Sequence, residues 1–315
     1  MALLTFSKRS LLMPSALLVF LAACSLVYLD IKERTVNEFN SEQLILARTA
    51  SQGISSFFKD YQSDLTFLSD LREMIDFNDE GKNRIKDFYS VHEGIIAAIT
   101  RVDASGRILY TYPENESVIG KDISYQKHVR EVIETHKPVI SDVFRSIQGY
   151  LAIAIHVPVF KDKQYVGSLA LLIPIDELGN LYLGKIKVRG TGNIWLLSEN
   201  GVEIYCPEKG HTGESFVELS NNDPSIVNLM RKIKNQQGGT VKASPPDLQT
   251  NGRKRRNTGY ITFYRTTLGN TYWTILISYQ EKEIYEALTR LRNRLIFVFS
   301  VFFAIVIIIF IHLRR

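Results

Sequence analysis

The feature that most constrains this chain is an apolar run near its C-terminus. Nineteen residues, Leu295–Leu313, contain only one strongly polar side chain, His312. A membrane-spanning helix needs roughly 20 consecutive apolar residues, and a helix in a soluble protein would carry a polar stripe. The run therefore predicts a transmembrane helix over residues 295–313.

A second apolar run covers residues 11–29 and follows Lys8 and Arg9. A membrane anchor is favoured because the run continues past any cleavage point, but two alternatives are open. Basic residues before a short apolar stretch are also typical of a cleaved signal peptide. The residues before Cys24 resemble a lipoprotein signal, in which Cys24 would be lipidated.

Two spans place both termini on one side of the membrane. Lys8, Arg9, Arg314 and Arg315 flank the spans and favour the cytoplasm for residues 1–10 and 314–315. Long loops translocate largely regardless of their charge. Everything between the spans, residues 30–294, is therefore expected outside the cytoplasm.

The cysteines and the net charge limit which disulfides and which charged partners the region between the spans can have. Cys24 and Cys206 are the only cysteines, so the region between the spans cannot contain an internal disulfide. Much of the net charge of +5 comes from Arg253–Arg256, which predicts a solvated hairpin loop or a contact with anionic lipid headgroups. An extracytoplasmic location excludes nucleic acid as a partner.

The first part of the outer region predicts a long stalk helix over residues 30–78. Its apolar residues recur at intervals of four and three, which places them on one helix face. They are Ile54, Phe58, Tyr61, Leu65 and Leu68.

Two modules with similar patterns follow. Residues 79–180 predict an antiparallel five-stranded sheet with a helix after the second strand: strands 95–102, 107–112, 141–145, 149–159 and 165–173, and helix 125–135. Residues 181–279 repeat this order: strands 192–197, 202–206, 239–244, 258–265 and 271–278, and helix 221–235. The fold class is therefore α+β, with the second module as a structural repeat of the first.

A final helix is expected over residues 280–294. No Pro or Gly separates it from the second span, so the two should form one rod. Its apolar stripe either pairs with a second chain as a homodimer or packs on the chain's own stalk helix. The stripe consists of Ile284, Leu288, Leu291 and Leu295.

Several stretches carry a family resemblance: Gly120–Ser124, Pro138–Ser141, Pro158–Phe160 with Val166-Gly167, Asn193–Leu197 with Glu199–Gly201, and Leu268–Trp273. Their order, together with the flanking spans, resembles the double Cache family of bacterial extracytoplasmic sensors over residues 30–294. The resemblance implies two PAS-like modules in a two-pass protein of the bacterial inner membrane, with a small-molecule ligand in the membrane-distal module. It also implies a signal passed through the second span to a cytoplasmic output partner or a fused output domain.

Patterns of catalysis are missing from the sequence. There is no nucleophile elbow, no Walker loop and no His, Cys and carboxylate cluster at metal spacing, and the His residues are scattered. We therefore expect a non-enzymatic protein without cofactor or metal site.

A binding pocket is predicted on one face of the strand at 149–159. Alternation separates bulky residues such as Ile153 from a face that contains Tyr150, Ala152, Ala154 and His156. Small side chains leave volume and the polar ones supply hydrogen bonds, as in a small-molecule pocket. The alternative is that a covering helix fills the space above the alanines.

The resemblance also narrows the ligand. Amino-acid-sensing members hold their ligand with an Arg and an Asp, and Gln126 and Leu172 stand at those positions here. A free α-amino acid is therefore not expected. The candidate ligand-binding residues are Tyr110, Tyr112, Tyr125, Lys127, His128, Arg145, Tyr150 and His156. The cationic donors among them suit a small carboxylate or another anion.

Two other interpretations remain open from the sequence. The outer region could be a ligand-free module that docks a periplasmic binding protein. The chain could also be the sensor part of a truncated histidine kinase, chemoreceptor or diguanylate cyclase.

Overall fold

The computed structural model describes the backbone of residues 3–184, 186, 188, 192–208, 210–243 and 259–314. Side chains are described from residue 19 onward, except at helical positions 176, 180, 181, 283, 287, 291, 306, 309, 310 and 312–314. The predicted Arg253–Arg256 loop lies outside the described residues. The chain divides into a body, residues 43–279, and a terminal unit formed by residues 1–42 and 280–315.

The terminal unit is a pair of long helices, parts of α1 (Leu3–Ser69) and α8 (Glu281–Arg314). Within this unit the Phe20 ring stacks on Phe299 and Phe302, with centroids 5.7 and 5.0 Å away. Lys32 Nζ lies 5.1 Å from the centroid of the Tyr285 ring. The prediction of one uninterrupted helix from residue 280 through the second apolar run is confirmed by α8.

Among the residues that the structure describes, no helix reaches the combined length and hydropathy expected of a membrane span. Both predicted spans include positions whose side chains lie outside the described set: residues 11–18 in the first, and residues 306, 309, 310, 312 and 313 in the second.

The burial of two residues bears on whether the apolar stripe of α8 packs within the chain or pairs with a second copy. Ile284 and Leu288 are each only 2% exposed in the single chain. This burial favours packing within the chain over pairing with a second copy. Leu291 lies outside the residues with described side chains.

The stalk helix is shorter than predicted. It ends at Ser69 rather than at residue 78, and two further helices follow: α2 (Arg72–Ile75) and α3 (Asp79–Val91). The Asn78 carboxamide caps α3 by accepting a 3.0 Å bond from the Gly81 N–H. A Cβ at Gly81 would lie 2.3 Å from the Glu73 carbonyl oxygen, so only glycine allows this close approach. Residues 78–81, where the sequence predicted the end of the stalk helix and the start of the first module, therefore form the beginning of α3.

The module of residues 72–182, which keeps the name distal module from the sequence interpretation, contains a six-stranded antiparallel sheet within the described chain. Its strand order is β2-β1-β6-β5-β3, with β4 also paired to β5. The strands are β1 (Ala98–Asp103), β2 (Ile108–Tyr112), β3 (Val139–Ile140), β4 (Phe144–Arg145), β5 (Leu151–Lys161) and β6 (Gln164–Pro174). The helices are α2, α3, α4 (Lys127–Thr135) and α5 (Ile175–Tyr182).

The five-stranded prediction differs because residues 141–145 do not form one strand. The Ser141 hydroxyl accepts a 2.8 Å bond from the Ala154 N–H in place of a backbone carbonyl. Next to it, the Asp142 carboxylate accepts from the Val143 N–H. Side-chain bonds thus interrupt the ladder. Pairing with β5 is made by β3, just before the predicted strand, and by β4, which is only its last two residues.

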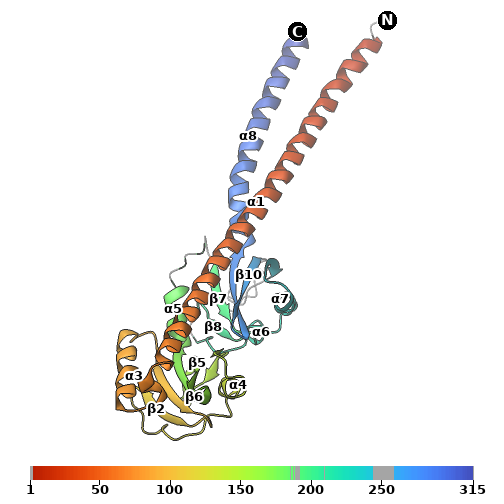
Figure 1. Ribbon diagram of the computed structural model, residues 1–315. Helices are drawn as coiled ribbons and strands as arrows, with labels where there is room; N and C mark the ends of the chain where they lie inside the picture. The colour runs from red at the N-terminus through yellow and green to blue at the C-terminus, as the bar shows by residue number, and fades with distance from the viewer. Residues whose placement is uncertain are drawn as a thin grey trace. The chain divides into compact units, whose positions relative to one another are not determined.

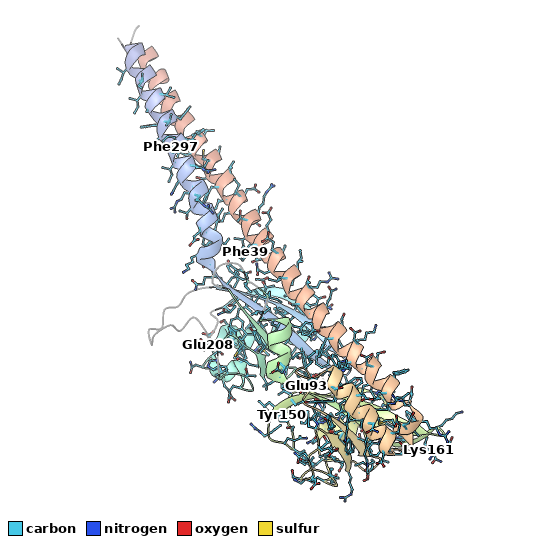
Figure 2. All side chains as sticks on the ribbon, turned by 90° about the vertical axis from the view of Figure 1, so that its left-hand side faces the viewer. Phe39, Glu93, Tyr150, Lys161, Glu208 and Phe297 are labelled. Carbon is cyan, nitrogen blue, oxygen red and sulfur yellow. The ribbon has the colours of Figure 1, made fainter. Side chains whose placement is uncertain are left out.

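Different helices cover the two faces of the distal sheet (Figure 1). On one face, the buried Arg101 of β1 donates to the Met74 carbonyl of α2 over 3.5 Å. Lys161, which lies at one end of the body in Figure 2, contacts Asp76 Oδ1 through its Nζ at 2.8 Å. The other face lies under α4 and carries Ala154 and Thr100.

The proximal module, residues 193–279, repeats this arrangement. Its sheet of five described strands has the order β8-β7-β11-β10-β9. The strands are β7 (Asn193–Leu197), β8 (Glu203–Tyr205), β9 (Gly238–Ala243), β10 (Gly259–Leu268) and β11 (Thr271–Gln280), and the helices are α6 (Phe216–Leu219) and α7 (Pro224–Asn235). Trp273 meets the ring of Phe58 on α1 at 4.9 Å. The opposite face packs its large side chains against Leu229 of α7.

Candidate functional site

A cavity of about 20 Å³ lies on the α4 side of the distal sheet. This volume is enough for about one water molecule. Its wall combines small or apolar side chains with neutral polar ones. The lining residues are Thr100, Ile108, Ile123, Gln126, His128, Phe144, Ser146, Ile147, Gln148, Ala154, His156, Ala170 and Leu172.

Strand register explains why the cavity forms at this place. Ala154 of β5 pairs with Leu172 of β6, and Thr100 of β1 pairs with Ala170. Two alanines and a threonine therefore form the floor of the cavity, where larger residues would fill the space beneath α4. The prediction that this face of β5 lines a pocket is supported at Ala154 and His156, whereas Ala152 is buried outside the lining.

Two histidines dominate the polar part of the wall. The rings of His128 on α4 and His156 on β5 have centroids 5.1 Å apart, and His156 Nδ1 lies 3.3 Å from the Ser168 hydroxyl. Burial lowers the pKa of His128 to about 4. Burial, together with the neighbouring His128, also lowers the pKa of His156 well below its usual value. Both rings are therefore neutral near pH 7, and each offers one donor and one acceptor nitrogen.

The segment between β4 and β5 supplies the outer wall. Gln148 Oε1 is buried and has no hydrogen-bond partner in the part of the chain that the structure describes. A buried acceptor without a partner costs about 1–3 kcal/mol. This carboxamide oxygen is therefore suited to accept a hydrogen bond from a bound N–H or O–H group.

The tyrosines of β2 do not enter the cavity. The Tyr110 hydroxyl donates to Glu114 Oε1 at 3.0 Å, and burial followed by this bond raises its pKa to about 12. The Tyr112 ring meets Tyr89 of α3 edge-on, with centroids 5.2 Å apart. Both predicted residues thus contact the α3 side of the module.

Four further candidate residues lie outside the cavity lining. Tyr125 and Lys127 are exposed at the start of α4. Arg145 is exposed as well, and its Nη1 donates to the Gly149 carbonyl over 2.7 Å. Tyr150 is half-buried and packs with a small apolar cluster that includes Leu172. The structure therefore brings only His128 and His156 of the eight candidates into the cavity wall.

The lining also contains residues that sequence reasoning assigned otherwise or missed. Gln126 and Leu172, which the sequence resemblance was expected to align with charged residues of amino-acid sensors, both line the cavity. Thr100 could have been found from the alternation of β1. Gln148 lies in an irregular segment, where no periodicity indicates the direction of a side chain.

Solved structures share this fold at low sequence identity. An extracellular ligand-binding receptor from Desulfohalobium retbaense matches with a TM-score of 0.60 and 22% identity over 75% of this chain, which spans 40% of that receptor. The ligand-binding domain of the Pseudomonas aeruginosa amino-acid chemoreceptor PctC, in complex with GABA, matches with a TM-score of 0.59 and 16% identity. That match covers 76% of this chain and 99% of the other.

A third structure, the ligand-binding domain of the Pseudomonas fluorescens chemoreceptor CtaA with L-isoleucine, has a TM-score of 0.62 and 15% identity, covering 81% of this chain and 98% of the other. No curated protein matches the sequence. The dCache_1 family model, described as a Cache domain, matches residues 28–288. Since that match spans most of the chain, the protein belongs to the Cache domain family in its double form.

Proposed function

We propose that the chain is the ligand-sensing region of a membrane-bound receptor, and that its distal cavity binds a small polar molecule without net charge. The observation that carries this proposal is the cavity over Ala154 and Ala170, with the neutral His pair on its wall. Cavities that combine apolar walls with a few polar groups are typical of small-molecule sites. The role is one of binding rather than catalysis, as in other Cache sensor modules.

The charge of the wall supports an uncharged ligand over the carboxylate expected from sequence. No Lys, Arg, Asp or Glu is among the described lining residues. Lys127 and Arg145, the expected cationic donors, are exposed outside it. A charged ligand would lose its hydration without gaining an opposite charge, which costs several kcal/mol.

Entry of a metabolite requires the wall to move. A cavity of about 20 Å³ is much smaller than the roughly 300–1,000 Å³ typical of ligand sites. The wall at 144–148 is held by β4, which has only two residues, and it is followed by Gly149 at φ +99°. Outward displacement of this segment would enlarge the cavity by giving up the two residue pairs between β4 and β5, while the pairing of β5 with β6 stays intact.

We further propose that the receptor is a two-pass protein of the bacterial inner membrane with residues 30–294 outside the cytoplasm. The apolar runs at 11–29 and 295–313 support this topology. The modules predicted at residues 79–180 and 181–279 then act as the sensor modules far from the membrane and near to it. The continuous helix α8 suits a rod that passes a displacement to a cytoplasmic output domain or partner. A homodimer would use a face of α8 other than Ile284 and Leu288.

A thermal-shift screen of the purified full chain tests the ligand class. A ligand that binds only the folded state stabilises it by RT ln(1 + [L]/Kd), about 2.7 kcal/mol at one hundred times Kd. We expect Tm to rise with uncharged polar metabolites and to stay unchanged with small carboxylates. A shift produced by carboxylates alone would overturn the assignment of an uncharged ligand.

A further inference from the structure

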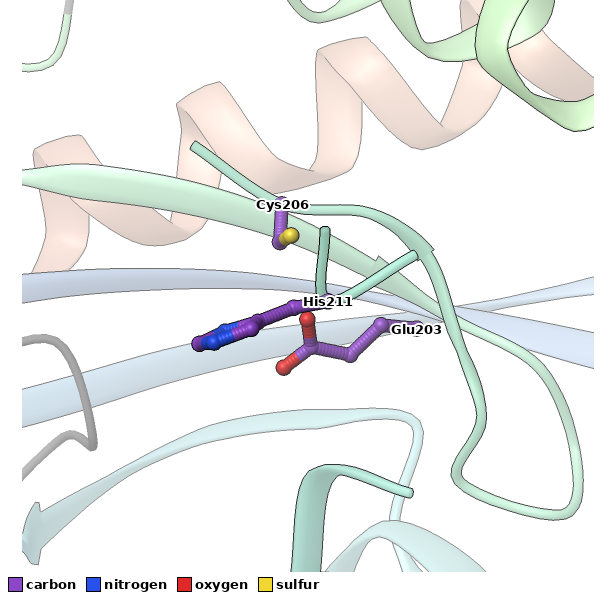
Figure 3. Close-up of side chains that lie close together, drawn as sticks. All are labelled: Glu203, Cys206 and His211. Carbon is purple, nitrogen blue, oxygen red and sulfur yellow. The ribbon is translucent and has the colours of Figure 1, made fainter. Parts of the chain in front are cut away.

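The proximal module contains a group of side chains that the proposed function does not use. Glu203, Cys206 and His211 each direct one potential metal-ligand atom toward the others, and these atoms all lie within 4.8 Å of one another (Figure 3). Sequence analysis expected no metal site, because no familiar motif has the spacing Glu-x₂-Cys-x₄-His. The fold brings the three together through a loop that returns on itself.

Backbone bonds hold this loop closed. The Glu203 N–H donates to the Glu214 carbonyl over 2.9 Å, and the Gly213 N–H donates to the Glu203 carbonyl over 2.8 Å. Gly210 and Gly213 have φ values of +92° and +91°, a conformation that suits glycine. These bonds hold His211 close to β8, the strand that carries Glu203. A pre-ordered loop loses little entropy when it closes around a ligand.

Two of the three side chains are buried, and the third is accessible to solvent. Glu203 and Cys206 are 1% and 9% exposed, and His211 is intermediate. The two buried side chains would form the inner half of a site, and the accessible imidazole would admit an ion from solvent.

The donor set selects the class of ion. Thiolate, imidazole and carboxylate are the three ligand types that Zn²⁺ takes, whereas Mg²⁺ and Ca²⁺ prefer oxygen alone. Glu208 Oε2 lies 3.4 Å from His211 Nδ1, which leaves Nε2 of that ring for a metal. Carboxylates that hold the second ring nitrogen are frequent partners of metal-bound His.

We propose that Glu203, Cys206 and His211 bind a thiophilic divalent ion of the Zn²⁺ class, with water completing a tetrahedral site. Bond lengths of about 2.0–2.3 Å require ligand atoms roughly 3.3–3.8 Å apart, so the loop must contract by about 1 Å. On binding, the Cys206 thiol gives up the 2.9 Å bond that it donates to the Glu208 carbonyl and loses its proton to solvent, and no oxidation or reduction takes place.

Co²⁺ is the sharpest probe, because a thiolate–cobalt bond gives charge-transfer absorption that oxygen and nitrogen ligands do not. The purified full chain, stripped with a chelator, should take up one Co²⁺ with this absorption, and added Zn²⁺ should abolish it. Cys206→Ser should remove the band, and His211→Asn should weaken Co²⁺ binding at least tenfold. Cys24→Ser and His136→Asn, which alter residues outside the cluster, should retain wild-type behaviour.

Folding of each variant is checked by circular dichroism without metal. If Cys206→Ser does not fold, the partly exposed His211 provides the decisive variant. Absence of the charge-transfer band in the wild type, or equal Co²⁺ binding by the wild type and His211→Asn, would overturn the site. Neither result bears on the distal cavity, whose ligand is tested separately.

Discussion

The two modules have the same strand order but different side chains beneath their equivalent helices. In each sheet the last strand in the sequence, β6 or β11, lies at the centre. Under α4 the distal sheet places Ala154 and Ala170, which line a cavity. Under α7 the proximal sheet places Trp195 and Phe263, which belong to a continuous apolar core. In this chain, side-chain volume on one face, rather than topology, therefore distinguishes the sheet that forms a pocket from the sheet that forms a core.

The largest expected effect comes from opening the filled face. Phe263→Ala should lower the free energy of unfolding by about 3–5 kcal/mol, because it removes a fully buried ring and leaves a void. Ala154→Gly, on the cavity side, should cost only about 1 kcal/mol. Urea unfolding of the full chain measures both. Equal losses would mean that the two faces are packed alike.

The next effect is a dependence of stability on pH that originates in the distal module. The pKa of His128 is about 4 in the folded chain, against roughly 6.5 when unfolded. The unfolded state therefore binds the proton first. The stability that the folded state gains from a neutral His128 is complete above about pH 6.5 and is lost as the pH falls toward 4. Between pH 7 and 5 the loss from His128 should be about 2 kcal/mol.

His156 should add to this loss, because its pKa is lowered in the same direction. Urea titrations at pH 7 and 5 measure the difference, and His128→Gln should reduce it. Hydrogen exchange assigns the loss to a module: amides of β6 should lose protection at pH 5 before those of β11. Simultaneous loss in both strands would show that the histidines do not act on the distal module alone.

A smaller effect is expected at α3, which has no counterpart among the described elements of residues 193–279. Asn78→Ala removes the bond from the Gly81 N–H and should cost about 1 kcal/mol. The matched control is Asn115→Ala, a turn residue whose carboxamide accepts from the Ser117 N–H. Faster amide exchange in α3 for Asn78→Ala alone supports the cap. Unchanged exchange there would contradict it.

The sequence predicted the fold correctly where the pattern of apolar residues was regular. Alternation along Leu151–Val159 separated the bulky face of β5 from the face that lines the cavity. The Pro-free run after Gln280 predicted one helix. It failed where single side chains replace backbone bonds. Ser141 replaces a backbone acceptor at the start of the predicted strand 141–145, of which only Phe144 and Arg145 pair with β5. Asn78 caps a helix that was not predicted.

The candidate site was harder to predict than the fold. His156 was found because it alternates with Ala152 and Ala154 on β5, and His128 was found because the family resemblance pointed to the segment around Gln126. Arg145 was chosen for its charge, but its guanidinium binds the Gly149 carbonyl outside the lining. Gln148 was missed because its direction depends on an irregular segment. Charge and residue type indicate what a side chain can bind, whereas only the backbone path decides which cavity it reaches.

The most direct measurement compares ligand affinity after equal overpacking of the two modules. Ala154→Leu fills the distal cavity, and Ala243→Leu adds the same atoms to the proximal core. Both should cost about 1–3 kcal/mol of stability. Titration calorimetry with the ligand identified by thermal shift should give at least a hundredfold weaker binding for Ala154→Leu and wild-type affinity for Ala243→Leu. Unchanged affinity in Ala154→Leu, or an equal loss in both variants, would contradict a binding site in the distal cavity.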